Sequence, residues 1–210
     1  MTWPGTDADG RKYADGVYIA TVSASSSLGK AAPRTVRITI DTVAPGLTSA
    51  DVRPGAFSPN GDGWSDTVKV RHVPAERCAR VSILDNDGTI RRRLIDWRSQ
   101  SKAAHSATWD GKVSDSGRLV AAAEGEYKFS IECRDAAGNT SRKGVKVALD
   151  RTLGFSTATP ETLSPNGDGV SDSTTLGFNL TRSATVRLAV KVGDKTVRAF
   201  ELGSLGAGSH

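Results

Sequence analysis

The chain has 210 residues, with 28 Lys and Arg against 23 Asp and Glu, so its net charge is +5 and its isoelectric point is near 9.4. A content of 37% hydrophobic, 24% charged and 6% aromatic residues is typical of a globular protein and excludes a disordered or membrane-embedded chain. Its apolar runs are far shorter than the roughly 20 residues of a bilayer span, and its first residues lack an export-signal pattern. We therefore expect neither membrane insertion nor a signal peptide here. A net charge spread this thinly does not predict nucleic-acid binding, which takes a concentrated basic stripe.

Short strands separated by turns are predicted along the chain. Apolar residues alternate with polar ones at Tyr127, Phe129, Ile131 and Cys133, a period of two that is typical of half-buried antiparallel strands. In chain order the strand segments are 16–24, 36–41, 127–133, 145–149 and 176–180. Turn sequences rich in Asn, Asp and Gly divide the chain at short intervals, and extended linkers are expected at 41–45 and 150–153.

The sequence repeats itself. Residues Phe57–Asp66 and Leu163–Asp172 share eight of ten positions at a spacing of 106 residues. Two weaker similarities, at a spacing of 109 residues, link 16–24 to 125–133 and 36–41 to 145–150. These spacings predict one complete repeat at 47–152, preceded by the C-terminal half of a repeat at 1–46 and followed by the N-terminal half of a repeat at 153–210.

The repeat unit predicts an all-β fold. It contains six or seven short strands in about 100 residues, and no segment shows the 3.6-residue apolar period of a helix. We expect tandem immunoglobulin-like antiparallel β-sandwiches.

The order of motifs resembles a known family. Ser-Pro-Asn-Gly-Asp-Gly is followed by an alternating strand, a hairpin at Asn86–Arg91, then Thr108–Gly111, Gly125–Tyr127 and Asp135–Asn139. This series is similar to the immunoglobulin-like domain named after the flagellar hook-capping protein, which also occurs in secreted bacterial subtilisin-like proteases and in tandem in surface proteins. The resemblance implies a spacer, scaffold or adhesive module in an extracytoplasmic protein, and no reaction. The sequence departs from the family at Pro4, which stands where the complete copy has Asp110, so the turn after Trp3 is expected to differ.

The two Asn-Gly-Asp-Gly loops are the main candidates for a site. Their side-chain oxygens fall at positions one, three and seven of a tight turn, which is a pattern that calcium favours. The residues are Asn60, Asp62, Asp66, Asn166, Asp168 and Asp172. The same side chains are also typical caps of turns that need no ion, and both interpretations stay open. A further acidic loop at Asp7, Asp9 and Asp15 is interpreted as turns.

The two cysteines, Cys78 and Cys133, both lie in the complete repeat. A disulfide between them would indicate an oxidising compartment and would stabilise the fold by roughly 4 kcal/mol for a loop of 55 residues. Cys133 has the inward parity of its strand, whereas Cys78 is out of phase with Ala79, so the pair would need a bulge. Two thiols that act as small core residues are the alternative.

No catalytic machinery is predicted, so we do not expect an enzyme. His72, His105 and His210 stand in separate segments without a nucleophile motif, and His72 is expected to be a partly buried strand residue. The sequence contains no phosphate loop, zinc spacing or nucleophile elbow.

Three functional hypotheses follow. The first is a spacer, scaffold or adhesive repeat of a secreted or surface protein. The second is binding of a glycan or cell-wall polymer through Trp97, Trp109 and the Arg91–Arg93 run, although that run is equally interpreted as a solvated strand face. The third is an accessory region of a secreted hydrolase. A role in the flagellar hook is disfavoured, because tandem copies and paired cysteines fit a surface protein better.

The two half repeats predict a partner. Either half alone would expose an apolar face and unpaired strand edges. We therefore expect the tail half of one molecule to be completed by the head half of the next, a head-to-tail contact that forms filaments or rings.

Overall fold

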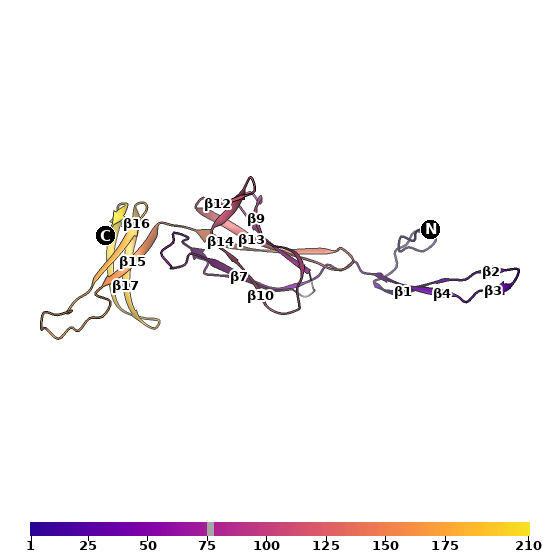
Figure 1. Cartoon of the computed structure of the whole chain (residues 1–210), viewed down its shortest axis with the longest axis horizontal. Helices are drawn as coiled ribbons and strands as arrows, with labels where there is room; N and C mark the ends of the chain where they lie inside the picture. The colour runs from indigo at the N-terminus through magenta and orange to yellow at the C-terminus, as the bar shows by residue number, and fades with distance from the viewer. Residues whose placement is uncertain (75–77) are drawn as a thin grey trace.

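A computed structural model describes residues 1–74 and 78–210, with the backbone alone described at Cys78 (Figure 1). All regular elements in these residues are strands, and no helix there is long and apolar enough to cross a membrane. The predicted all-β class is therefore confirmed. We use the predicted bounds as names: the head half (1–46), the middle unit (47–152) and the tail half (153–210).

The head half is a long hairpin. Strands β1 (Gly16–Val22) and β4 (Arg34–Ile40) pair antiparallel along their whole length, and the short strands β2 (Ser25–Ser26) and β3 (Gly29–Lys30) extend their tip. The residues before β1 form a loop whose Trp3 and Tyr13 rings pack with the ring of Tyr18 on β1, with ring centroids 5.5 to 5.9 Å apart.

The middle unit contains two larger sheets and a hairpin. The first sheet has the order β10 (His105–Trp109), β7 (Val68–Pro74), β5 (Leu47–Arg53). The second has the order β6 (Ala56–Phe57), β14 (Thr140–Leu149), β13 (Gly125–Arg134), β8 (Cys78–Leu84), β9 (Ile90–Ser99). The hairpin joins β11 (Lys112–Asp115) to β12 (Arg118–Ala121). Neighbouring strands are antiparallel except β6 and β14.

One core lies between the two sheets. Alternate residues of each strand point inward, such as Val68, Val70 and His72 of β7 and Phe129 and Ile131 of β13. Trp109 has no exposed surface, and its ring lies 5.1 Å from Phe57, 4.9 Å from Tyr127 and 6.2 Å from Phe129. The four predicted inward side chains at Tyr127–Cys133 are all buried. Ser130 and Glu132 on the other face of β13 are buried as well, so the strand is not half-buried there as the alternation predicted. Glu132 is covered by its ion pairs with Arg80 and Arg142.

The tail half contains a three-stranded sheet and a hairpin. The sheet has the order β15 (Leu153–Thr159), β16 (Thr175–Leu180), β19 (Gly208–Ser209), and the hairpin pairs β17 (Ala184–Val192) with β18 (Lys195–Leu205). Their facing apolar side chains line open grooves instead of a closed core. The head half and the tail half lie at opposite ends of an elongated molecule, with the middle unit between them (Figure 1).

The head half repeats the local bonding of the middle unit. The indole Nε1 of Trp3 donates to the carbonyl oxygen of Thr6 at 2.8 Å, as Nε1 of Trp109 donates to Lys112 at 2.7 Å. The turn after Trp3 therefore keeps this bond in spite of Pro4. In the middle unit Asp110 also accepts the backbone N–H of Lys112 at 3.2 Å on Oδ1, and Pro4 has no side-chain oxygen for such a bond, so the two turns differ in that respect.

Candidate functional site

The loop at residues 58–66, which we call the junction loop, is built around one carboxylate. Asp66 accepts the backbone N–H groups of Asn60 at 3.0 Å and Gly61 at 2.7 Å on Oδ1, and that of Gly63 at 2.8 Å on Oδ2. Gly61 and Gly63 have φ of 86° and 88°, a left-handed conformation that side chains other than glycine rarely adopt. The spacing of Gly and Asp in the motif thus produces a tight, fully capped turn.

A second carboxylate connects this loop to the tail half. Asp62 accepts the N–H of Trp64 on Oδ1 at 2.8 Å and the N–H of Phe155 on Oδ2 at 2.7 Å. These two backbone donors, Trp64 first and then Phe155, hold the pKa of Asp62 below its ordinary value. Asp62 therefore serves both its own turn and the first strand of the next repeat.

Two further side chains of the loop bind the same linker. The hydroxyl of Ser58 donates to the carbonyl oxygen of Leu153 at 3.2 Å, and Nδ2 of Asn60 donates to it at 3.4 Å. Gly154 is buried beneath the loop, where a Cβ atom would overlap the Asn60 amide. The absence of a side chain at Gly154 is thus what lets the linker approach.

Arg151 holds the linker from the other side. Its Nε donates to the carbonyl oxygen of Pro59 at 3.1 Å, and its Nη1 donates to that of Ala122 at 3.0 Å. Glu124 accepts the backbone N–H of Arg151 at 2.7 Å and forms an ion pair with Arg182 of the tail half. Charged and backbone groups of the middle unit therefore surround the start of the tail half.

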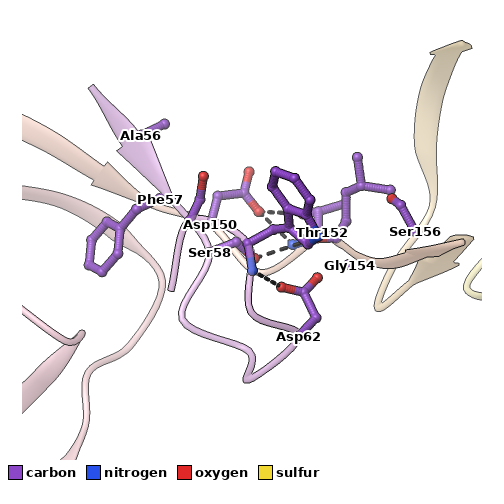
Figure 2. Close-up of a pocket in the computed structure, with 11 residues that line it drawn as sticks. Ala56, Phe57, Ser58, Asp62, Asp150, Thr152, Gly154 and Ser156 are labelled. Atoms are coloured by element: carbon purple, nitrogen blue, oxygen red, sulfur yellow. Dashed lines mark hydrogen bonds between the residues drawn. The ribbon is translucent and has the colours of Figure 1, made fainter. Parts of the chain in front are cut away.

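An open groove of about 320 Å³ lies beside this junction. Figure 2 shows Ser58 and Asp62 from the loop and Thr152 and Gly154 from the linker around it. Trp64 lines the groove with 76% of its surface exposed. Trp64 was not among the predicted site residues, although its place in the variable position of the repeated motif was the available signal.

The second loop has the same internal bonds. Asp172 accepts the N–H groups of Gly167 and Gly169, both at 2.8 Å, and Asp168 accepts that of Val170 at 2.8 Å. These donors hold the pKa values of both carboxyl groups below the ordinary value. The only partner described for Oδ2 of Asp168 is Nδ2 of Asn166 within the same loop, at 3.0 Å. The two predicted loops thus share the same internal hydrogen bonds. They differ in that Asp62 of the junction loop also bonds to the tail half.

The carboxylate oxygens of both loops point at N–H groups, which is the geometry of a capped turn. A calcium ion would need these oxygens to leave their amides. Among the described residues, no group of three or more His, Cys, Asp or Glu side chains is placed to hold a metal ion. In the acidic loop of the head half, Asp7 accepts the N–H groups of Asp9 and Arg11, and Asp15 accepts that of Thr42. These are turn and linker bonds.

The predicted disulfide falls partly outside the described residues, because the side chain of Cys78 is not among them. Cys133 is fully buried on β13, and its register partner on β8 is Ala79, the residue next to Cys78. The pairing stays a prediction.

The three histidines lie in two sites. His72 is fully buried, more deeply than we expected from its sequence, and its Nε2 lies 2.9 Å from Oε1 of Gln100. The His105 ring lies 5.9 Å from the His72 ring, and the His210 ring stacks on Phe178 at 5.4 Å. Burial lowers the pKa of His72, with His105 as a smaller contributor in the same direction.

The structure corrects the sequence-based prediction of a glycan-binding surface. Trp109 is in the core, so its assignment to an exposed strand face is wrong. Two guanidinium groups lie over the ring of Trp97, that of Arg80 at 4.7 Å and that of Arg134 at 4.5 Å from the ring centroid. In the arginine run, Arg91 bonds to Asp85 at 2.6 Å and Arg92 bonds to Asp110 at 2.5 Å.

No protein-family model matches this chain, and no curated protein matches it. Among solved structures, the crystal structure of dimeric latent PorU from Porphyromonas gingivalis is similar over 67% of this chain, with 14% sequence identity and a TM-score of 0.40. The chain spans 13% of the length of that structure. A likeness at this level carries no argument about function.

Proposed function

We propose that the chain is a non-catalytic repeat module, made of tandem immunoglobulin-like β-sandwiches, that acts as a spacer or scaffold in a secreted or surface protein of bacteria. The observation that carries this proposal is the clamped junction. Ser58, Asn60 and Asp62 of the middle unit bind backbone groups of Leu153 and Phe155 at the start of the tail half.

A spacer needs junctions that resist bending. Consecutive domains joined by a free linker rotate relative to one another unless an interface holds them. Here the bonds from the junction loop fix the linker at Leu153 and Phe155 of β15. The pair Arg182–Asp150, at 2.9 Å, adds a contact between the two units. The other junction is held by Nδ2 of Asn139, which donates to the carbonyl oxygen of Asp41 at 3.0 Å.

The same contacts support membership in the hook-capping type of immunoglobulin-like domain. The motifs that carry the resemblance supply the contacts at both junctions: the Ser-Pro-Asn-Gly-Asp-Gly loop at one and the Asp135–Asn139 turn at the other. In this proposal, their polar side chains are retained for joining repeats, not for catalysis. The extracytoplasmic location follows from the same resemblance.

Single-molecule FRET tests the stiffness of the junction at picomolar chain concentration, where self-association is negligible. Dyes at the exposed positions Lys102 and Asp194 report the distance between the middle unit and the tail half. We expect one narrow distribution for the native chain and a broad one for the double variant Asn60→Ala, Asp62→Ala. The matched double variant Asn166→Ala, Asp168→Ala changes the same motif in the second loop, where the described partners of these side chains lie within the loop itself. Its distance distribution should stay narrow. A broad distribution in the native chain would contradict the spacer function.

A second function, binding of a glycan or cell-wall polymer, is favoured by Trp64. Its exposed indole borders the groove that also contains Asp62, and an aromatic face beside a carboxylate suits the apolar face and hydroxyl groups of a sugar ring. Sedimentation with purified cell wall tests this. Retention that is lost in Trp64→Ala and kept in Val170→Ala would support it, and no retention of the native chain would exclude it.

A further inference from the structure

The second sheet of the middle unit has a polar face that is turned away from the core. On β13 the residues that alternate with the buried apolar ones are Lys128, Ser130, Glu132 and Arg134. Residues that lie opposite one another in an antiparallel pair share a face of the sheet. The register partners of these residues on β8, β9 and β14 therefore belong to the same surface, which we call the outer face.

Two buried hydroxyl groups lie side by side in the middle of the outer face. Ser82 on β8 and Ser130 on β13 are register partners, and only 1% and 2% of their surface is exposed. No hydrogen-bond partner is described for the Oγ atom of either residue. A buried hydroxyl group without a partner destabilises a fold, so two of them in one place point to a ligand that accepts their hydrogen bonds.

A cation lies on each side of this hydroxyl pair. Arg93 on β9 is the register partner of Ser82, and Gly144 on β14 is the register partner of Ser130. Lys128 extends over Gly144, because a Cβ atom there would lie 1.8 Å from Cε of Lys128 and 2.8 Å from its Nζ. The ammonium group thus occupies the place that a side chain of residue 144 would take. Across the four strands the order is guanidinium, hydroxyl, hydroxyl, ammonium.

The two flanking cations have no acidic partner in the described part of the chain. The first two arginines of the 91–93 run bond to carboxylates, whereas no ion pair is described for Arg93. None is described for Lys128 either, although Lys146 opposite to it pairs with Glu126 at 3.2 Å. A free guanidinium and a free ammonium group beside buried hydroxyl donors form a site for an anion.

The next positions along the strands add further positive charge. Arg80 and Arg142 lie opposite Glu132 from its two sides and share this one carboxylate. The guanidinium of Arg134 lies over the ring of Trp97, and no ion pair is described for it in the residues that the structure covers. The outer face therefore has excess positive charge along β13 as well as across it, which suits a polymer with repeated negative groups.

The donors of this face favour phosphate over other anions. A carboxylate has two oxygens in one plane, whereas the oxygens of a phosphate group are arranged tetrahedrally and accept from donors on several strands at once. Nucleic acid is disfavoured, because single strands bind proteins by stacking bases on aromatic rings. The guanidinium groups of Arg80 and Arg134 already lie over the ring of Trp97.

We propose that the outer face binds a linear, phosphate-rich polymer without bases. One phosphate group accepts from the hydroxyl groups of Ser82 and Ser130, and Arg93 and Lys128 neutralise its charge. Both cations are exposed and flexible, so they swing outward and admit the phosphate oxygens to the covered hydroxyl groups. This inference is independent of the spacer function and of the Trp64 groove, because none of these residues lines that groove.

Fluorescence polarisation of end-labelled linear polyphosphate measures binding to the full 210-residue chain. We expect binding that weakens as the salt concentration rises. The double variant Arg93→Gln, Lys128→Gln should bind about tenfold to a hundredfold more weakly. The matched double variant Arg37→Gln, Lys30→Gln removes the same charges from exposed positions of the head half and should keep the native affinity. No binding by the native chain, or equal losses in the two variants, would overturn the proposal.

Gly144→Ala tests the position of the ammonium group without a change of charge. The added methyl group overlaps Cε of Lys128 and displaces a flexible side chain, and the backbone of Gly144 is not left-handed, so the variant should fold. We expect binding to weaken by about threefold to tenfold. Gly55→Ala is the control, because its Cβ position has open space. Native affinity in Gly144→Ala would overturn the assignment of the site.

The double variant Ser82→Ala, Ser130→Ala separates a binding role of the hydroxyl groups from a structural one. Buried hydroxyl groups without partners do not stabilise the free chain, so its melting temperature should equal or exceed the native value. Its affinity for polyphosphate should fall by about tenfold. A lower melting temperature together with an unchanged affinity would overturn the proposal.

Competition identifies the chemistry of the ligand. At equal concentration of negative charge, unlabelled polyphosphate should displace the probe more effectively than polyglutamate or single-stranded DNA does. Equal or better displacement by polyglutamate would make the occupant an acidic peptide, and equal or better displacement by DNA would make it a nucleic acid. Either result would overturn the proposal.

Discussion

Asp62 and Phe155 are separated by 93 residues, and Oδ2 of Asp62 accepts the backbone N–H of Phe155 at 2.7 Å. The other oxygen of the same carboxylate accepts an N–H from its own turn, Trp64, at 2.8 Å. One side chain thus couples the folding of a local loop to the position of the following repeat. This dual use gives a physical reason for an aspartate rather than an asparagine, because both oxygens must accept.

The first prediction concerns this bond. Asp62→Ala should remove the acceptor of the Phe155 amide, so that its hydrogen exchange becomes faster while amides in β13 keep their protection. Exchange measured by NMR or mass spectrometry checks this. Asp168→Ala is the control, since the described partners of that carboxylate lie within its own loop. Unchanged exchange at Phe155 in the Asp62 variant would contradict the clamp.

The second prediction concerns calcium. The oxygens of Asp62 and Asp66 already accept backbone N–H groups, so we expect the melting temperature to be the same in chelator and in millimolar calcium. A ligand that binds the folded state alone would raise it. A rise that Asp62→Ala abolishes would instead establish the calcium interpretation of the two loops.

The sequence was informative where a pattern is local. The period-two alternation at Tyr127–Cys133 identifies the apolar side chains that face the core, because successive strand residues point to opposite sides of a sheet. It does not predict that Ser130 and Glu132 on the other face are buried as well. The repeated motif likewise predicts the capped turn around Asp66, whose partners are all within six residues. The hydrogen bond between Asp62 and Phe155 of the tail half could not be predicted from the sequence, because it depends on the path of a linker that is distant along the chain.

The burial of two residues was predicted incorrectly from the sequence. Trp109 was assigned to a binding surface although Ala107 and Trp109 share the inward parity of β10, a strand of five residues that is too short for the pattern to stand out. His72 was expected to be partly buried, and its full burial depends on Gln100, which follows a strand of the other sheet and bonds to its ring.

The third prediction concerns the cysteines. We expect Cys78 and Cys133 to resist alkylation until the unfolded chain is reduced, as a disulfide requires. Mass spectrometry of protein purified and denatured without reductant checks this. Alkylation of both thiols before reduction would remove the cysteine argument for an oxidising compartment and leave two small core residues.

The fourth prediction concerns the core. Trp109→Ala removes the ring that contacts Phe57, Tyr127 and Phe129, and should lower the free energy of unfolding by about 3 to 5 kcal/mol. Trp64→Ala removes an exposed ring of the same kind and should change it by less than about 0.5 kcal/mol. Denaturant unfolding followed by circular dichroism checks both values. Similar losses in the two variants would contradict the placement of the core.

The last prediction concerns pH. His72 is fully buried and its Nδ1 has no described hydrogen-bond partner, so the folded state favours the neutral ring and the pKa lies below its ordinary value of 6.5. As the pH falls below 6.5, the unfolded chain binds a proton at this site that the folded chain does not bind. Stability should therefore fall with pH from 6.5 down to the lower folded-state pKa. Asp62 and Asp168 have pKa values lowered from 3.8, so the stability they contribute is lost only near and below that value.

Melting temperatures recorded between pH 7 and pH 5 isolate the His72 contribution. His72→Phe should flatten this part of the curve, and a ring of this kind fits the fold, because Phe178 occupies the corresponding position beside His210. His105→Asn should keep most of the slope, because the His105 ring is only partly buried and contributes less than burial to the pKa of His72. An equal slope in the native chain and in His72→Phe would show that another group titrates in this range and that the buried ring is not the cause.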